Sequence, residues 1–404
     1  MKTKFLTIIL FVHLGLFASE LFKSNPDLAS NNYLSKTSFE VESLETYINE
    51  VVSFKSEKGI LYGWQEFPFT STKLLTSHVV LCFYSFKDSS FREVYREKIP
   101  KNENHYLFDL ELKNNKWYLL SEEQVRESDN KPIKNAFRVQ IFDELFFPIS
   151  DFAYEGRVGK RMWFKEGNIM LIRGYVKEFN GIRVSMGKQI LTLNDFGNIL
   201  SNSELPDRAF NCSTANEWMY SFCKERLITL SYQSNCLSDN NTHSFLGCIY
   251  NSGQTRTIDL SKHSTVYDYI VLDDNILMFS TYKDSSNYGI NMFGELEYKY
   301  DYAISRFDLE FNIIEQIKFD ETVVENSLNY STFSALEFLN DPSFIQIGGG
   351  VFSIDLKSNR IEGIFETTNS ILLNVQKEKE YFYCLLVNFI DKGQVLKVQR
   401  IPIR

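Results

Sequence analysis

Histidine is scarce in this sequence, with five residues in a chain of 404. They are His13, His78, His105, His243 and His263. None belongs to an His-Glu-x-x-His motif or to another paired metal-ligand spacing. A calcium loop of the Asp-x-Asp-x-Asp-Gly type is also missing. The sequence therefore predicts no metal site and no cofactor.

Motifs for covalent catalysis and phosphate binding are missing as well. The string Arg183-Val-Ser-Met-Gly187 is the nearest to the Gly-x-Ser-x-Gly elbow of the α/β-hydrolases, and it lacks the first glycine. The glycine run at residues 348–350 is not followed by Lys-Ser or Lys-Thr, so it is not a phosphate-binding loop. The catalytic residues stay unknown, and the sequence favours a protein that is not an enzyme.

Long apolar runs are limited to the N-terminus. Residues 5–17 are mostly apolar, follow Lys2 and Lys4, and are followed by two small residues. This pattern predicts a cleaved signal peptide over residues 1–19, because the run is shorter than the ~20 residues of a membrane span. We therefore expect a secreted or periplasmic protein with no transmembrane segment in the mature chain. The net charge of −9 disfavours nucleic acid as a partner.

Four tight turns, each flanked by alternating apolar residues, recur at intervals of roughly 50 residues. Each contains Asp, Asn or Gly where a turn needs a positive φ or a side-chain hydrogen bond. The turns cover residues 193–199, 249–255, 307–313 and 354–360. Strand–turn–strand units of this length resemble the blades of β-propellers in general, without the signature of a named propeller family. The resemblance implies an all-β fold of antiparallel strands around a central channel.

The repeat predicts one β-propeller domain over residues 37–404, preceded by a flexible leader over residues 20–36. Counting segments gives seven blades of four antiparallel strands, with six blades as the alternative. Residues 369–404 are too few for four strands, so we expect Ser38–Glu42 or the stretch after it to supply the outermost strand and cover the open edge. Residues 37–51 also show helical spacing, so a helix is the alternative there. Two or three β-sandwich domains are the alternative to a ring.

The six cysteines fall into two groups. Cys82 and Cys384 lie in strongly apolar strands, which predicts buried free thiols. The other four fall within one predicted blade, where an exported protein can form disulfides. The blade alignment predicts the pairs Cys212–Cys236 and Cys223–Cys248.

The connections between the second and third strands are long in three successive predicted blades, and extra length on a rigid scaffold is where binding residues usually lie. The predicted contact residues are Tyr175, Arg183, Asp239, His243, Asp284 and Tyr288. They offer aromatic rings, guanidinium donors and acceptors suited to a polar ligand. We therefore predict an exported binding module for a glycan or a peptide-like ligand.

Two other functions remain open. The first is a carbohydrate-active enzyme that uses carboxylates facing the channel, for which Asp268, Glu217 and Glu337 lie on predicted inner strands. The second is a structural component of an envelope or surface. No motif chooses among the three functions, so the sequence identifies neither a ligand nor a substrate.

Overall fold

The computed structural model describes most of the chain from residue 38 onward, in segments separated by short gaps. The described residues are 38–41, 46–48, 51–68, 77–100, 103–125, 134–179, 182–204, 218–223, 226–234, 243–251, 254–259, 263–272, 275–290, 296–319, 336–367, 370–390 and 393–403. All regular elements in these segments are β-strands. Among them there is no helix long and apolar enough to cross a membrane.

The described strands form seven antiparallel sheets of four or five strands each, named I to VII in chain order. Sheet I contains β2 (Thr46–Ile48), β3 (Val52–Lys55), β4 (Gly59–Pro68), β5 (His78–Ser85) and β6 (Phe91–Lys98). Sheet II contains β7 (Glu103–Lys113), β8 (Lys116–Val125), β9 (Lys134–Phe142) and β10 (Pro148–Glu155). Sheet III contains β11 (Arg157–Val158), β12 (Trp163–Lys165), β13 (Asn168–Phe179), β14 (Ile182–Leu193) and β15 (Ile199–Glu204).

The second half of the chain repeats this arrangement. Sheet IV contains β16 (Trp218–Cys223), β17 (Arg226–Ser234), β18 (His243–Asn251) and β19 (Gln254–Asp259). Sheet V contains β20 (His263–Val271), β21 (Asn275–Ile290), β22 (Leu296–Asp308) and β23 (Ile313–Phe319). Sheet VI contains β24 (Leu336–Phe338), β25 (Phe344–Ile347), β26 (Gly350–Asp355) and β27 (Arg360–Glu366). Sheet VII contains β28 (Ile371–Glu378), β29 (Tyr381–Ile390), β30 (Gly393–Pro402) and β1 (Ser38–Val41).

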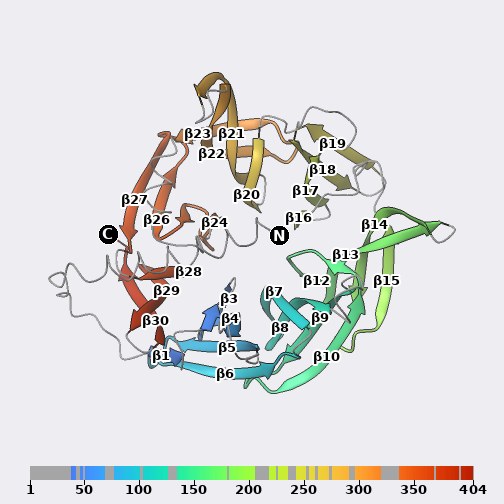
Figure 1. Ribbon diagram of the computed structural model, residues 1–404, viewed down its shortest axis with the longest axis vertical. Helices are drawn as coiled ribbons and strands as arrows, with labels where there is room; N and C mark the ends of the chain where they lie inside the picture. Colours follow the sequence, from blue (N-terminus) through green and yellow to red (C-terminus); the bar gives the residue numbers. More distant parts are fainter. Residues whose placement is uncertain are drawn as a thin grey trace, which may run out of the picture.

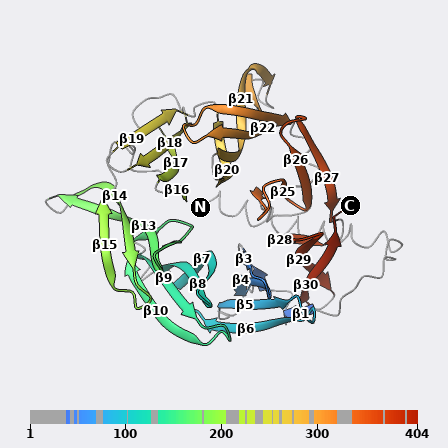
Figure 2. The same ribbon diagram turned by 180° about the vertical axis from the view of Figure 1, so that it is seen from behind.

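The sheets follow one another around a ring in chain order, as the two opposite views show (Figures 1 and 2). Within each sheet the strands are joined as antiparallel neighbours, from an inner first strand to an outer last strand. The fold is therefore an all-β propeller built from four-stranded antiparallel units, as the sequence predicted.

The first and the last described strands, β1 and β30, pair in sheet VII. Strand β1 pairs with β30, with Ser38 opposite Lys397 and Val41 opposite Gln394. The prediction that the N-terminal segment supplies the outermost strand of the last unit is confirmed. The helical alternative for residues 37–51 is wrong, because the described parts of that segment are strands β1 and β2. Pairing with β30 gives the backbone groups of that segment hydrogen-bond partners and covers a sheet edge.

The apolar core consists of side chains packed between neighbouring sheets. Between sheets I and II, the ring of Trp117 stacks on Phe146 at 5.8 Å between centroids and meets Phe83 edge-on at 6.4 Å. Trp64 and Tyr62, on the opposite face of sheet I, are fully buried toward sheet VII. Each such side chain contributes about 1.5–3 kcal/mol when buried. The high aromatic content therefore serves packing between sheets.

One turn recurs between the third and fourth strands of sheets II, III and V. It begins with an Asp or Asn whose Oδ1 accepts hydrogen bonds from the backbone N–H groups two and four residues later, at 2.8–3.0 Å. These first residues are Asp143, Asn194 and Asp308. The fourth residue has a positive φ, which is 67° at Phe146, 81° at Gly197 and 62° at Phe311. The turns predicted over residues 193–199, 307–313 and 354–360 are confirmed, and strands β18 and β19 flank the fourth one.

Candidate functional site

The predicted contact residues lie at the ends of the sheets that carry the connections between second and third strands. Tyr175 is in β13, Arg183 in β14, His243 begins β18, and Asp284 and Tyr288 are in β21. Asp239 lies outside the described residues. The five placed residues therefore come from three consecutive sheets, III, IV and V, on the face opposite to the tight Asx turns.

In sheets III and V strand pairing extends into these connections, with one register irregularity in each, and the prediction of long loops is wrong there. In sheet III the pairing of β13 with β14 runs on through Tyr175 opposite Gly187, past the end of β15. In sheet V, Tyr288 pairs with Tyr298, well beyond the last partner of β23. The backbone pairing of these segments makes them extended hairpins rather than irregular loops.

The two extended hairpins do not meet. In Figure 1 the tips of β13–β14 and β21–β22 reach outward from the ring at separate places, with sheet IV between them. A ligand that touches both hairpins therefore has to span sheet IV. The convergence of the predicted contact residues on one site stays a prediction.

Two of the predicted cysteine assignments can be placed. Cys82 and Cys384 are buried free thiols, as predicted. Cys223 lies on β16 and Cys248 on β18, with the whole of β17 between them. Two steps of ~4.8 Å between strands put these backbones about 9.6 Å apart, which exceeds the ~7 Å limit for a disulfide and argues against this pair.

The predicted pair Cys212–Cys236 lies outside the described residues and stays a prediction.

Asp268, one of the predicted channel carboxylates, joins two sheets. Its Oδ1 accepts a hydrogen bond from the backbone N–H of Tyr269, and its Oδ2 accepts one from the N–H of Phe338 in sheet VI, both at 2.8 Å. The position follows an irregularity in the pairing of β20 with β21. Glu217 lies outside the described residues, and Glu337 is in β24.

The same arrangement occurs in two other sheets. Asp109 follows an irregularity in β7, and its Oδ2 accepts the N–H of Met162, ahead of β12, at 2.8 Å. Asn374 follows one in β28, and its Oδ1 accepts the hydroxyl of Ser53 in sheet I at 2.6 Å. A β-bulge re-aims a side chain, here toward the first strand of the next sheet. These Asx residues therefore act as structural ties, a role that the sequence reasoning missed.

A charged group nevertheless lies among Asp109 and Glu111 of β7, Asp268 of β20 and Arg161, which precedes β12. Arg161 lies 3.3 Å from Oδ1 of Asp268 and stays 41% exposed. Burial raises the pKa of Asp109 to about 7, against the opposing effects of the Met162 N–H and Arg161. Burial, followed by the negative charge of Asp109, raises the pKa of Glu111 to about 8. This group of acids holds protons near neutral pH.

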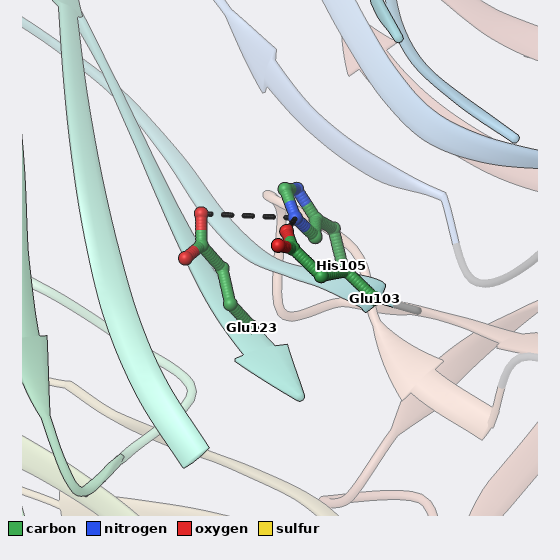
Figure 3. A group of neighbouring side chains, drawn as sticks. All are labelled: Glu103, His105 and Glu123. Atoms are coloured by element: carbon green, nitrogen blue, oxygen red, sulfur yellow. Dashed lines mark hydrogen bonds and ion pairs between the residues drawn. The ribbon is translucent and has the colours of Figure 1, made fainter. Parts of the chain in front are cut away.

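A second cluster, Glu103–His105–Glu123, lies between sheets I and II on the face of the 2–3 connections (Figure 3). His105 is 3% exposed and stands opposite Glu123 in the pairing of β7 with β8. Its Nε2 lies 3.1 Å from Oε2 of Glu103 and 3.7 Å from Oε1 of Glu123. One atom from each residue falls within 4.8 Å of the others, a grouping that can hold a metal ion.

Further polar groups surround the Glu103–His105–Glu123 cluster. Arg138 of β9 approaches Oε1 of Glu123 at 3.5 Å, Oε1 of Glu97 at 2.9 Å and Oδ1 of Asp151 at 2.7 Å. Burial raises the pKa of Glu123; His105 and Arg138 oppose this, and Glu103 and Asp151 reinforce it. The region thus contains four carboxylates, one guanidinium and one imidazole. Its net charge attracts cations.

The sequence reasoning missed this cluster because its members come from two strands. Glu103 and His105 alternate on β7, which places both side chains on one face, while Glu123 enters from the neighbouring strand. Metal motifs read along the chain require ligands close in sequence. The available signal was the Glu-x-His alternation on a predicted strand, followed by an acidic pair one hairpin later.

Comparisons with known proteins add fold information only. No known family model and no curated protein match this chain. Among solved structures, polysaccharide lyase Uly1 is 9% identical, with a TM-score of 0.49 over 94% of each chain. The β-propeller domain of the Trilobed protease from Pyrococcus furiosus is 8% identical, with a TM-score of 0.48 over 90% of this chain and 96% of that chain. The hydrogen-bonded sheets themselves define the β-propeller.

Proposed function

We propose that this protein is an exported β-propeller binding module that takes a glycan or a peptide-like ligand on the face of the 2–3 connections. In this proposal each of the seven described sheets is one blade of the ring. The observation that carries the proposal is the difference between the two faces. Compact Asx turns close one face, while extended hairpins of sheets III and V project from the other end of the sheets.

The two hairpins supply the polar and aromatic residues for this contact. Tyr175 and Arg183 belong to the hairpin of sheet III, and Asp284 and Tyr288 to that of sheet V, with His243 on sheet IV between them. Because the tips are separated around the ring, an extended chain-like ligand fits this arrangement better than a compact one. A glycan chain or an extended peptide has that shape.

The experiment is a glycan and peptide array probed with the purified mature protein. In the test variant, both hairpins are shortened to tight turns by replacing residues 176–186 and 284–297. The matched control is Phe196→Ser, which changes a 77% exposed residue on the opposite face. We expect the shortened variant to lose the array signal and the control to keep it. A folded shortened variant that retains every ligand refutes this binding face.

Export is the second part of the proposal. It is supported by the signal-peptide pattern of residues 1–19. Mass spectrometry of the protein made with its leader in a secreting host tests it. We expect the mature chain to begin at or near residue 20 and to be recovered outside the cytoplasm. An intact N-terminus in a cytoplasmic fraction contradicts it.

A carbohydrate-active enzyme is the second candidate, favoured by the protonated acids of the channel. Glu111, with its pKa raised to about 8, has the property of a general acid, and Asp109 and Arg161 lie beside it. Asp268 is a weaker candidate for a catalytic carboxylate than the sequence suggested, because both of its oxygens already accept backbone hydrogen bonds. Hydrolysis of an array glycan by the parent and its loss in Glu111→Gln support this candidate; binding without turnover supports the module.

A further inference from the structure

We propose that Glu103, His105 and Glu123 form a binding site for one divalent transition-metal ion between sheets I and II. The proposal is independent of the ligand-binding function above, because it rests on residues of sheet II rather than on the extended hairpins. A site made of one imidazole and two carboxylates suits ions of the zinc class. An all-oxygen site, by contrast, favours calcium or magnesium.

The distances between the ligand atoms fit such an ion. Tetrahedral coordination with bonds of about 2.1 Å separates the ligand atoms by about 3.4 Å. The distances from Nε2 of His105, 3.1 Å to Glu103 and 3.7 Å to Glu123, lie on either side of that value. Small rotations of the two glutamate side chains therefore suffice to bind the ion. The imidazole is held by the β7 backbone and is almost fully buried, so the site is preorganised.

The local charge favours a cation. Glu97, Glu103, Glu123 and Asp151 carry four negative charges when ionised, and Arg138 carries one positive charge. Arg138 interacts with Glu97, Glu123 and Asp151, whereas Glu103 is paired with the imidazole of His105. A divalent ion at His105 compensates this excess. Partly buried carboxylates gathered around one imidazole repel one another, and a bound cation reduces that repulsion.

A buried amide in the same interface points to a bound ligand. Gln65 of β4 is 1% exposed, and neither its Nε2 nor its Oε1 has a hydrogen-bond partner within the described structure. Strand alternation puts Gln65 on the same face as Leu61, which packs against Leu107 and Trp117 of sheet II. Gln65 therefore faces the sheet that carries the cluster, near the same end. A water bound to the metal as a further ligand gives such an amide a partner.

The location gives the metal a defined place in the fold. Glu103 begins β7 and Glu123 lies close to the end of β8, so the cluster lies where the connections of sheet II leave the ring. The ion would link the first two strands of sheet II and would remain close to the face of the 2–3 connections. An open coordination position there can accept a water molecule or an oxygen atom of a ligand.

Calorimetric titration of the full mature chain with Zn²⁺ tests the proposal. The protein carries no histidine tag and is first stripped with a chelator. We expect one ion per chain, and Glu123→Gln and Glu103→Gln each weaken the affinity by about 100-fold or more, since even outer-shell losses cost 10–100-fold. The control His78→Gln removes a half-buried histidine from the opposite face of sheet I and leaves the affinity unchanged.

Co²⁺ absorption adds a readout that a purely structural ion pair cannot produce. Co²⁺ bound by the parent should absorb in the visible region as expected for an ion of low coordination number. This absorption should be lost in both glutamine variants. Circular dichroism establishes whether each variant is folded. If one glutamine variant fails to fold, the other one carries the test. Absence of stoichiometric Zn²⁺ binding by the parent overturns the proposal. Equal affinity in the parent and in a folded glutamine variant also overturns it.

Discussion

Replacing Glu111 with glutamine should change how the stability of this protein depends on pH. In the folded chain, burial and the charge of Asp109 raise the pKa of Glu111 from its ordinary 4.5 to about 8. The folded state therefore keeps a proton that the unfolded chain has already lost. Consequently, the free energy of unfolding is highest below pH 4.5 and falls as the pH rises toward 8. The variant has no proton to keep at this position.

The size of the effect follows from the linkage relation. Each pH unit between the two pKa values changes the free energy of unfolding by ~1.36 kcal/mol, so the interval from ~5.5 to ~8 corresponds to at most about 3 kcal/mol. Screening by solvent reduces this, and we expect about 1–3 kcal/mol. At pH 8, Glu111→Gln should be as stable as the parent or more stable.

Urea unfolding, followed by tryptophan fluorescence, measures the free energy of unfolding of the parent and of the variant at pH 5.5 and at pH 8. Other raised acids, among them Asp109 and Asp268, change the parent in the same direction, so the comparison is between variant and parent. The exposed Glu57→Gln serves as a matched control and should leave the pH dependence intact. If Glu111→Gln and the parent lose the same free energy between the two pH values, the reasoning about a protonated Glu111 is refuted.

Two further predictions concern the fold. Deleting residues 20–41 removes β1 and exposes the edge of β30. The loss of four paired strand residues should lower the free energy of unfolding by about 2–5 kcal/mol, and size-exclusion chromatography should show aggregation. Deleting only residues 20–34 should change neither the free energy of unfolding nor the aggregation. Gly197 and Gly167 both have a φ of 81°, but a Cβ at Gly197 would lie 2.6 Å from the Phe152 ring, whereas one at Gly167 meets nothing within 4 Å. Gly167→Ala should cost about 1 kcal/mol and Gly197→Ala about 2–4 kcal/mol in urea unfolding, and equal costs would contradict the packing argument.

The sequence predicted the parts of the fold that depend on local chemistry. A turn such as Asp308 to Asn312 needs only a side-chain acceptor, a residue with positive φ and flanking alternation, all of which are visible in a single stretch. The strand supplied by the N-terminus was predicted from chain length alone. The turn needs information from one segment, and the closing strand needs only a count of residues along the repeats.

The candidate sites depended on information that the sequence does not carry. The tie between Asp268 and the Phe338 backbone joins two sheets, and the contact of His105 with Glu123 joins two strands. Pairing register sets both, and register was not available from the sequence. The hairpin through Tyr175 was misjudged for another reason, because its sequence contains polar residues and a glycine that are also typical of a loop.

The pairing of β1 with β30 has a consequence for the order of events in folding. Strand β1 pairs with a strand that follows it in the sequence by about 350 residues, since Val41 lies opposite Gln394. Contacts so distant in sequence form late, because the chain between them has to be ordered first. The entropic cost of closing the circle is modest, since each doubling of loop length adds only ~0.6 kcal/mol. Pairing of β1 with β30 is thus a late and slow step with a modest entropic cost. Until it occurs, the edge of β30 is unpaired and accessible to chaperones and to other copies of the chain.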